Sequence, residues 1–344
     1  MSSHGAAEGC SRRSAGRNQA LRSNRRPGRP QRSRGQEPSV CSLLLTVFFG
    51  TSDFWNSTVR VTCPIALAAV ACILTSRAGV LFVGVEGVML ISAFFSIAGV
   101  VWTGSIALGV VFAIVAGVVT SLFFGFLSMT LRMGDVVGGL VVHVLSIGLT
   151  AFLVEQWFSA GATIGALSLG PSWGSTGNHW LDIVAHQQPL TYFTVIGAIS
   201  VAIFLRTRLG LVVRSSGESV SVAQTLGIKL VRLRYCVLAA AGTLLGLAGV
   251  TIGLAIIGTF DTSIASGRGF IALACVILGA WRPLAVLAAS LLFGIAYAVQ
   301  FRVGAAGQWM QLLPYVVTLL AIALFWGRTQ GPAEEGLGLP NDSK

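Results

Sequence analysis

One carboxylate stands deep in an apolar run of this sequence. Glu86 lies in SRAGVLFVGVEGVMLISAFF, residues 76–95, where no other charged side chain follows Arg77. A charge at the centre of a lipid bilayer costs about 3 kcal/mol on insertion scales unless it faces a partner or a water-filled cavity. Glu86 is therefore the first candidate for contact with a polar solute that crosses the membrane. The alternative role is a buried structural hydrogen bond.

Glycines surround this carboxylate and recur in a second interrupted segment. Gly79, Gly84 and Gly87 allow a helix to break, and a broken helix presents free N–H groups near the middle of the membrane. The segment SGRGFIALACVILGAWRPLA, residues 266–285, likewise has a short apolar run between glycines. Paired segments of this kind indicate a translocation path. We expect the path to be lined by Gly84, Glu86, Gly87, Ser92, His143 and Gly269, with a hydrogen bond to a neighbouring helix as the alternative role for His143.

A basic segment between residues 206 and 234 predicts a contact with a soluble partner. It carries Arg206, Arg208, Arg214, Lys229, Arg232 and Arg234, and such clusters remain in the cytoplasm. Its middle, Glu218–Leu226, predicts a short amphipathic helix between two glycines. We expect the docking element to comprise Gly217, Glu218, Ala223, Leu226 and Gly227. The alternative is a solvated loop that only sets the topology.

The sequence holds no set of residues for catalysis. A phosphate-binding G-x-x-x-x-G-K-[ST] loop needs a lysine followed by Ser or Thr, and the only lysines are Lys229, which precedes Leu230, and Lys344 at the end. The six cysteines are scattered, without C-x-x-C or metal-ligand spacing. We therefore expect no enzyme, no metal site and no cofactor in this chain.

The overall composition is that of a membrane protein. Hydrophobic residues make up 54% of the chain and charged residues 10%, with a mean hydropathy of +0.80, whereas soluble domains carry about 25% charged residues. A spanning helix needs roughly 20 apolar residues. This length predicts nine spans, two of them short, at 59–76, 80–98, 105–130, 136–158, 190–206, 235–257, 269–282, 284–301 and 311–327.

The distribution of charge predicts the orientation and a tenth span. Residues 1–39 hold nine arginines and two glutamates, +7 of the net +11, and predict a disordered cytoplasmic tail. The segment 159–189 has no Lys or Arg and belongs outside. Nine spans would leave the arginine-rich tail outside, so we expect a further span at 40–55. The transmembrane domain then covers 40–327 and a polar cytoplasmic tail 328–344.

Small-residue spacing predicts where helices pack closely. Three pairs have the G-x-x-x-G spacing that brings helices together in lipid: Gly134 and Gly138, Gly242 and Gly246, and Gly249 and Gly253.

Three segments together resemble a known family. GVLFVGVEGVMLISAFF, RLGLVVRSSGESVSVAQTLGIKLVRLRY and GRGFIALACVILGAWRPLAVLAASLLFG are similar, in this order, to the permease subunits of bacterial ABC importers in the branched-chain amino acid and ribose-type permease family. The resemblance runs from about Thr58 to Phe301. The family usually has Asn before I-G-x-E-G, where this chain has Phe82 and Val83. Retention of Glu86 favours the nucleoside-type branch.

The resemblance implies an all-α, multi-pass protein of the bacterial cytoplasmic membrane, with nine or ten transmembrane helices that include broken half-helices, as in type II importers. It implies a second permease chain, a separate cytoplasmic ATPase that binds ATP and Mg²⁺, and an extracytoplasmic substrate-binding lipoprotein. Residues 218–226 would be the coupling helix. The expected solute is a nucleoside. One alternative keeps this kind of importer but changes the solute to a simple sugar. The other is a different class of protein, a secondary transporter in which Glu86 binds a proton or cation.

Overall fold

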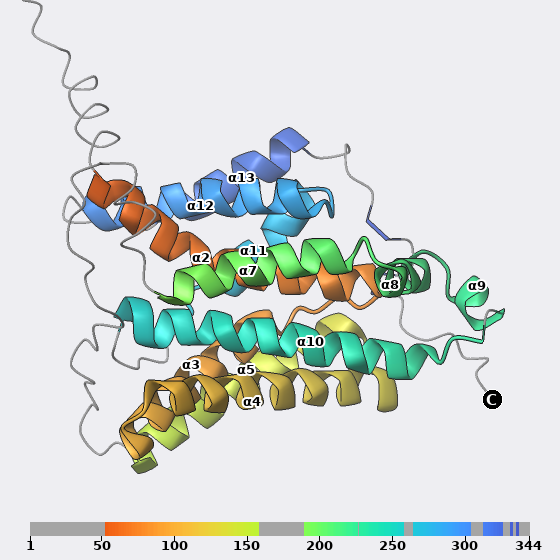
Figure 1. The fold of residues 1–344 in the computed structure, drawn as a ribbon, viewed down its shortest axis with the longest axis horizontal. Coiled ribbons are helices and arrows are strands. Elements are labelled where there is room, and N and C mark those ends of the chain that lie inside the picture. The colour runs from red at the N-terminus through yellow and green to blue at the C-terminus, as the bar shows by residue number, and fades with distance from the viewer. Residues whose placement is uncertain are drawn as a thin grey trace, which may run out of the picture. The chain divides into compact units, whose positions relative to one another are not determined.

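The computed structural model describes residues 52–157, 189–225, 227–257, 264–303, 312–325, 331–332 and 335–336 (Figure 1). All of them belong to one compact unit, 45–344. Every regular element in these ranges is a helix, as the sequence predicts. The predicted tail at 1–39 and the external segment 159–188 lie outside the described residues.

Six helices are long and apolar enough to cross a membrane. They are α2 (Ser52–Arg77), α3 (Val85–Thr103), α4 (Ile106–Gly125) with its continuation η1 (Phe126–Thr130), α5 (Asp135–Trp157), α10 (Leu230–Val250) with its continuation η2 (Thr251–Ile257), and α12 (Pro283–Val303). The bent pair α7 (Pro189–Phe204) and α8 (Arg208–Glu218) would make a seventh. The remaining helices are short: α9 (Val220–Thr225), α11 (Arg268–Leu278) and α13 (Leu313–Phe325).

Each of the nine predicted spans overlaps one of these helices. The tenth, at 40–55, is not tested, because residues 40–51 lie outside the described residues and the last four form the first turn of α2.

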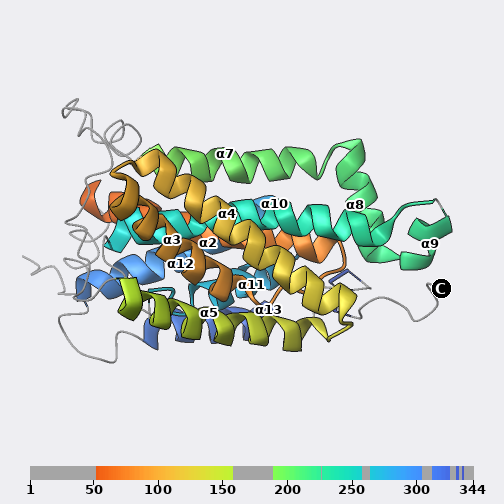
Figure 2. The same cartoon turned by 90° about the horizontal axis from the view of Figure 1, so that it is seen from below.

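Helices α2, α3 and α10 form the centre of the bundle (Figure 2). More than three quarters of the spanning window of each is buried, compared with 28% for α4 and α5. The outer faces of α4 and α5 expose large apolar side chains such as Val119 and Phe152. Such surfaces suit lipid or another membrane subunit, since no water is present there to hydrate them.

Two of the three G-x-x-x-G predictions are confirmed by close contacts. A Cβ on Gly242 would lie 2.8 Å from the Gly117 carbonyl oxygen of α4, and one on Gly249 would lie 2.8 Å from the Met89 carbonyl oxygen of α3. The prediction for Gly134 and Gly138 is wrong. A Cβ on Gly134 would meet nothing within 4 Å, and one on Gly138 would meet only side chains, at 3.7 Å or more, which is an ordinary van der Waals distance.

One of the two interrupted segments forms a half-helix. Helix α11 has 11 residues, about 16 Å at 1.5 Å per residue, roughly half the hydrocarbon thickness. The prediction of a second half-helix at residues 79–87 needs correction. The helix that carries Glu86, α3, has 19 residues and is long enough to span the membrane by itself. The glycines at 79 and 84 belong instead to a connector, residues 78–84, which joins two long helices and turns where Gly79 has φ +77°.

Candidate functional site

Glu86 lies in the first turn of α3 and is only 7% exposed. Its Oε1 accepts a hydrogen bond of 2.8 Å from the backbone N–H of Gly267, the residue before α11. The positive end of the α11 dipole therefore points at the carboxylate and stabilises its charge. Oε2 has no hydrogen-bond partner among the described residues. One oxygen thus holds the half-helix in place and the other is left for a further donor.

Gly269 allows this contact between α3 and α11. A Cβ at Gly269 would lie 2.6 Å from Glu86 Cβ and 2.7 Å from its Cα and N atoms, closer than real Cβ contacts. Any side chain would push the half-helix away from the carboxylate. The structure therefore brings together Glu86 and Gly269, two residues of the predicted path, through a backbone approach that only glycine permits.

Arg268 is a buried charge that the sequence reasoning missed. It is 3% exposed. Its Nη1 donates to the Ile264 carbonyl oxygen at 2.9 Å, whereas its Nε has no partner among the described residues. The guanidinium carbon lies 5.6 Å from the centre of the Tyr297 ring on α12, within the range of a cation–π interaction. The signal in the sequence was an arginine between two glycines at the start of an apolar run.

Two tyrosines support the turn before α11. The hydroxyl groups of Tyr297 on α12 and Tyr315 on α13 both donate to the Ser266 carbonyl oxygen, each at 3.4 Å. Ser266 has φ +44° and Gly267 φ +75°, so two consecutive left-handed residues open the half-helix. Helices α12 and α13 thereby fix the geometry of the N–H group that Glu86 binds.

Helix α5 packs on the other side of the Glu86 turn. A Cβ on Gly87 would lie 2.7 Å from Ser146 Oγ and 2.9 Å from His143 Cα, and one on Gly84 would lie 3.3 Å from the Gly139 carbonyl oxygen. The His143 ring meets the ring of Phe270, from α11, edge to face with centroids 5.7 Å apart. His143 Nδ1 is buried and has no partner within the described ranges. The residue thus joins α5 to the half-helix.

Ser92 lies apart from this cluster. A Cβ on Gly249 of α10 would lie 2.6 Å from Ser92 Cβ, so Ser92 belongs to the α3–α10 interface. The other five predicted path residues surround the start of α3, between α5 and α11.

The cluster combines buried donors and acceptors that are only partly used. Glu86 Oε2, Arg268 Nε and His143 Nδ1 lack partners among the described residues. Burying a polar group without a partner costs about 1–3 kcal/mol, so native proteins rarely leave such groups unless something binds them. The arrangement can bind a neutral solute that both donates and accepts hydrogen bonds.

Asp135, the first residue of α5, is a second buried carboxylate. It is 4% exposed. Its Oδ2 accepts the Leu81 N–H at 3.0 Å, and Oδ1 accepts the Ser128 hydroxyl. It therefore fixes the connector that leads to Glu86.

The basic segment forms two helices where one was predicted. The expected helix over 218–226 is α9, Val220–Thr225; Glu218 instead ends α8, and Leu226 lies outside the described residues. Ala223 is fully buried and packs with Val220 and Leu230 in a small apolar cluster. Gly227, with φ +76°, turns the chain toward α10.

The end of α8 rests directly on the connector. A Cβ on Gly217 would lie 2.4 Å from the Arg77 carbonyl oxygen and 3.0 Å from Gly79 N. Arg77 Nη1 lies 3.8 Å from Glu218 Oε1, and Arg234 Nε of α10 donates to the Ala78 carbonyl oxygen at 3.1 Å. Movement of α8 would therefore reach the connector, and through it the turn that carries Glu86.

We expect Gly217→Ala to separate α8 from the connector. The added methyl overlaps backbone atoms, and such overpacking costs about 1–3 kcal/mol, so the melting temperature should fall and uptake should drop about tenfold. Gly148→Ala is the matched control, because a Cβ there meets nothing within 4 Å. Uptake by Gly217→Ala equal to that of Gly148→Ala would contradict a role for this contact.

The chain is similar to known proteins over most of its length. The model of the family "Branched-chain amino acid transport system / permease component" matches residues 56–322. The nucleoside ABC transporter permease NupC of Lactococcus lactis subsp. cremoris is 29% identical over 80% of this chain and 92% of its own length. The guanosine ABC transporter permease NupQ of Bacillus subtilis is 30% identical over 82% and 94%. TsgC13 of Haloferax volcanii, a proposed glucose ABC transporter permease, is 31% identical over 72% and 76%.

Proposed function

The chain belongs to the branched-chain amino acid transport system permease family, and on that premise we propose that it forms half of the pore of an ABC importer for nucleosides. It is the multi-pass permease subunit of such a transporter and lies in the cytoplasmic membrane. The observation that carries the choice of solute is the similarity to NupC and NupQ over more than nine tenths of each of those proteins. Family membership also favours the ABC importer over a secondary transporter driven by Glu86.

The Glu86 cluster has the chemistry that a nucleoside requires. Ribose hydroxyls donate to a carboxylate and accept from a guanidinium, and Glu86 Oε2 and Arg268 Nε are the atoms that remain for them. Base rings stack on aromatic side chains, and Phe270 lies beside His143 at this site. We assign solute contact to these four side chains, and positioning to Gly84, Gly87 and Gly269.

Movement of the ATPase, driven by ATP, would be passed to this chain through α9. We assign to this helix the contact with a separate cytoplasmic ATPase, which holds ATP and Mg²⁺. Closure of the ATPase pair would displace α9 and α8, and Gly217 and Glu218 would transmit this displacement to Arg77 and the connector. Since the connector leads into α3, the Glu86 turn and α11 would move together and open the site to the other side of the membrane.

Two further partners complete the proposed assembly. A second permease chain, either identical or a sister, would cover part of the apolar outer surface of the bundle. An extracytoplasmic binding lipoprotein would deliver the solute to the external ends of the helices.

Competition for uptake tests the choice of solute. The complete transporter, produced in cells without other nucleoside uptake, should import labelled guanosine or adenosine. An excess of unlabelled nucleoside should remove most of that uptake, whereas ribose and glucose should leave it unchanged because they lack the base. Glucose is the second candidate, since TsgC13 is similar to this chain. Import of glucose without import of nucleosides would contradict the proposal and identify the chain as part of a glucose importer.

A further inference from the structure

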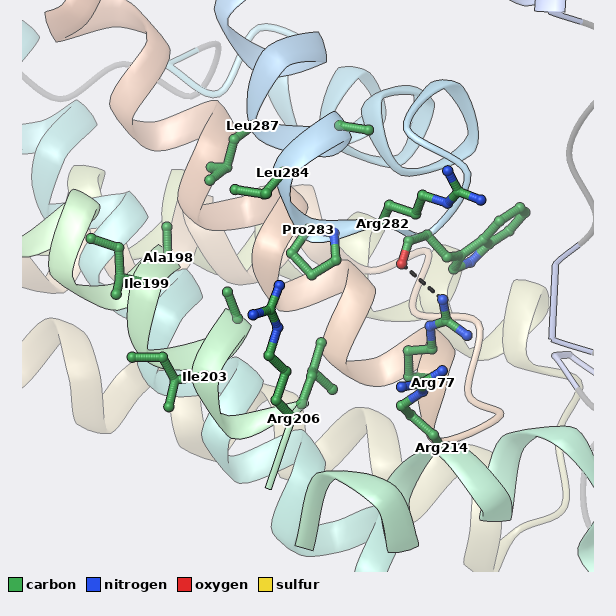
Figure 3. Close-up of a pocket in the computed structure, with 14 residues that line it drawn as sticks. Arg77, Ala198, Ile199, Ile203, Arg206, Arg214, Arg282, Pro283, Leu284 and Leu287 are labelled. Atoms are coloured by element: carbon green, nitrogen blue, oxygen red, sulfur yellow. Dashed lines mark hydrogen bonds between the residues drawn. The ribbon is translucent and has the colours of Figure 1, made fainter. Parts of the chain in front are cut away.

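A cavity of about 650 Å³ opens between α7 and α12, apart from the Glu86 cluster (Figure 3). Four arginines from four parts of the chain line it: Arg77 at the end of α2, Arg206 after α7, Arg214 on α8 and Arg282 before α12. In Figure 3, Arg206 extends toward Pro283, and Arg214 lies beside Arg77. Among the described residues that line it, none is acidic.

These positive charges are only partly compensated. The one described ion pair at the cavity joins Arg77 to Glu218 at 3.8 Å, and the Glu218 side chain is 59% exposed. Arg77 also donates to the Trp281 carbonyl oxygen at 2.9 Å. Glu335, from the C-terminal segment, lies near Arg77, and burial raises the pKa of its carboxyl group. One exposed and one partly buried carboxylate thus lie near Arg77, and within the described residues no ion pair is found for the other three arginines.

The cavity also receives the positive end of a helix dipole. Helix α12 begins at Pro283, and Pro283, Leu284 and Ala285 of its first turn line the cavity. N–H groups in the first turn of a helix have no partner within the helix and favour an anion. The N-terminus of α12 and the four arginines therefore both favour a negatively charged ligand.

The rest of the lining is apolar and continues into the lipid-facing surface. Ile199 and Ile203 of α7 are 51% and 60% exposed, and Leu284 of α12 is 72% exposed. These side chains form the walls of a slot between the two helices. A soluble anion gains nothing from such walls, whereas a hydrocarbon chain gains free energy from every CH₂ group that it buries there.

The position of the cavity corresponds to the level of lipid headgroups. Helices α7 and α8 meet at a bend of 75°, and the basic segment that follows places this bend at the cytoplasmic boundary. Leu209 and Leu211 of α8 are 68% and 64% exposed, as on a helix that lies along a membrane surface. Arg206 lies in the bend itself, and Arg214 lies on α8 beyond it.

We propose that this cavity binds an anionic phospholipid of the cytoplasmic leaflet, with its phosphate on Arg206 and Arg214 and an acyl chain between α7 and α12. The lipid would connect α7, α8 and α12 around the end of α2, next to the connector on which α8 rests. It would thereby stabilise the position of the cytoplasmic helices. The proposal does not depend on the identity of the transported solute.

Native mass spectrometry of the complete transporter, purified from vesicles of phosphatidylcholine and phosphatidylglycerol, tests this site. The wild-type protein should retain phosphatidylglycerol in preference to phosphatidylcholine. Arg206→Gln with Arg214→Gln should lower the retained phosphatidylglycerol at least about tenfold, because both charges that would bind the phosphate are lost. Arg208→Gln with Arg232→Gln is the matched control, since it removes two exposed cytoplasmic arginines that do not line the cavity.

Further measurements distinguish the lipid site from general surface attraction and from a site for soluble anions. Ala202→Trp, which fills the slot but keeps every arginine, should also reduce retention, whereas a site for soluble anions would be unaffected. Equal lipid loss in the Arg206/Arg214 and Arg208/Arg232 variants would overturn the proposal in favour of general surface attraction. Displacement of the lipid by excess inorganic phosphate, with phosphate bound in its place, would overturn it in favour of a soluble anion.

Discussion

Replacing Glu86 with leucine is expected to lower uptake about a hundredfold, equivalent to about 2.7 kcal/mol. The substitution removes the acceptor for the Gly267 N–H and leaves a buried donor at the start of α11 without a partner. It also removes the buried negative charge near Arg268. Glu86→Gln keeps an oxygen acceptor for Gly267 but loses the charge, so uptake should fall by about tenfold only. Initial rates of labelled nucleoside uptake measure both effects.

The comparison between the two variants separates solute binding from folding. Copurification of the ATPase should be unchanged in Glu86→Gln, because α8 and α9 are untouched. Glu155→Gln is the matched control, since that carboxylate is exposed near the end of α5. Wild-type uptake by Glu86→Leu would leave Glu86 with a structural role only. An equal loss in Glu86→Gln and Glu155→Gln would show that the effect is not specific to this site.

Replacement of residues 218–226 with a Gly/Ser linker should abolish both copurification of the ATPase and uptake. The linker removes α9, its buried Ala223 and the Glu218 contact with Arg77, so the docking surface is lost together with one of its links to the connector. The spanning helices are unchanged, and the chain should still reach the membrane. Affinity purification of the permease, followed by measurement of bound ATPase activity, gives the result.

A linker of the same length in place of residues 165–173 is the control for this replacement. That segment has no Lys or Arg and is predicted to lie outside the cell, so ATPase binding should persist there. Retention of the ATPase after removal of 218–226 would place the docking surface elsewhere, and α8 would be the next element to examine.

Much of the fold could be predicted because insertion of a helix into the membrane depends on the hydropathy and charge of consecutive residues. Nine apolar segments, the basic segment at 206–234 and the half-length run after Gly269 are each visible in consecutive residues. The predicted half-helix at residues 79–87 was wrong because the same glycine pattern also suits a connector between two long helices. The helix α8 was missed because its arginines indicate a solvated loop.

The partners of the important side chains depended on tertiary structure. The sequence by itself determined that Glu86 is a costly charge in an apolar segment, because burial in lipid follows from the neighbours in the chain. It could not determine that Gly267, 181 residues away, supplies the hydrogen bond, that Asp135 holds Leu81, or that four arginines surround one cavity. Such contacts depend on how closely and at what angles helices pack, and an apolar run of about 20 residues encodes neither.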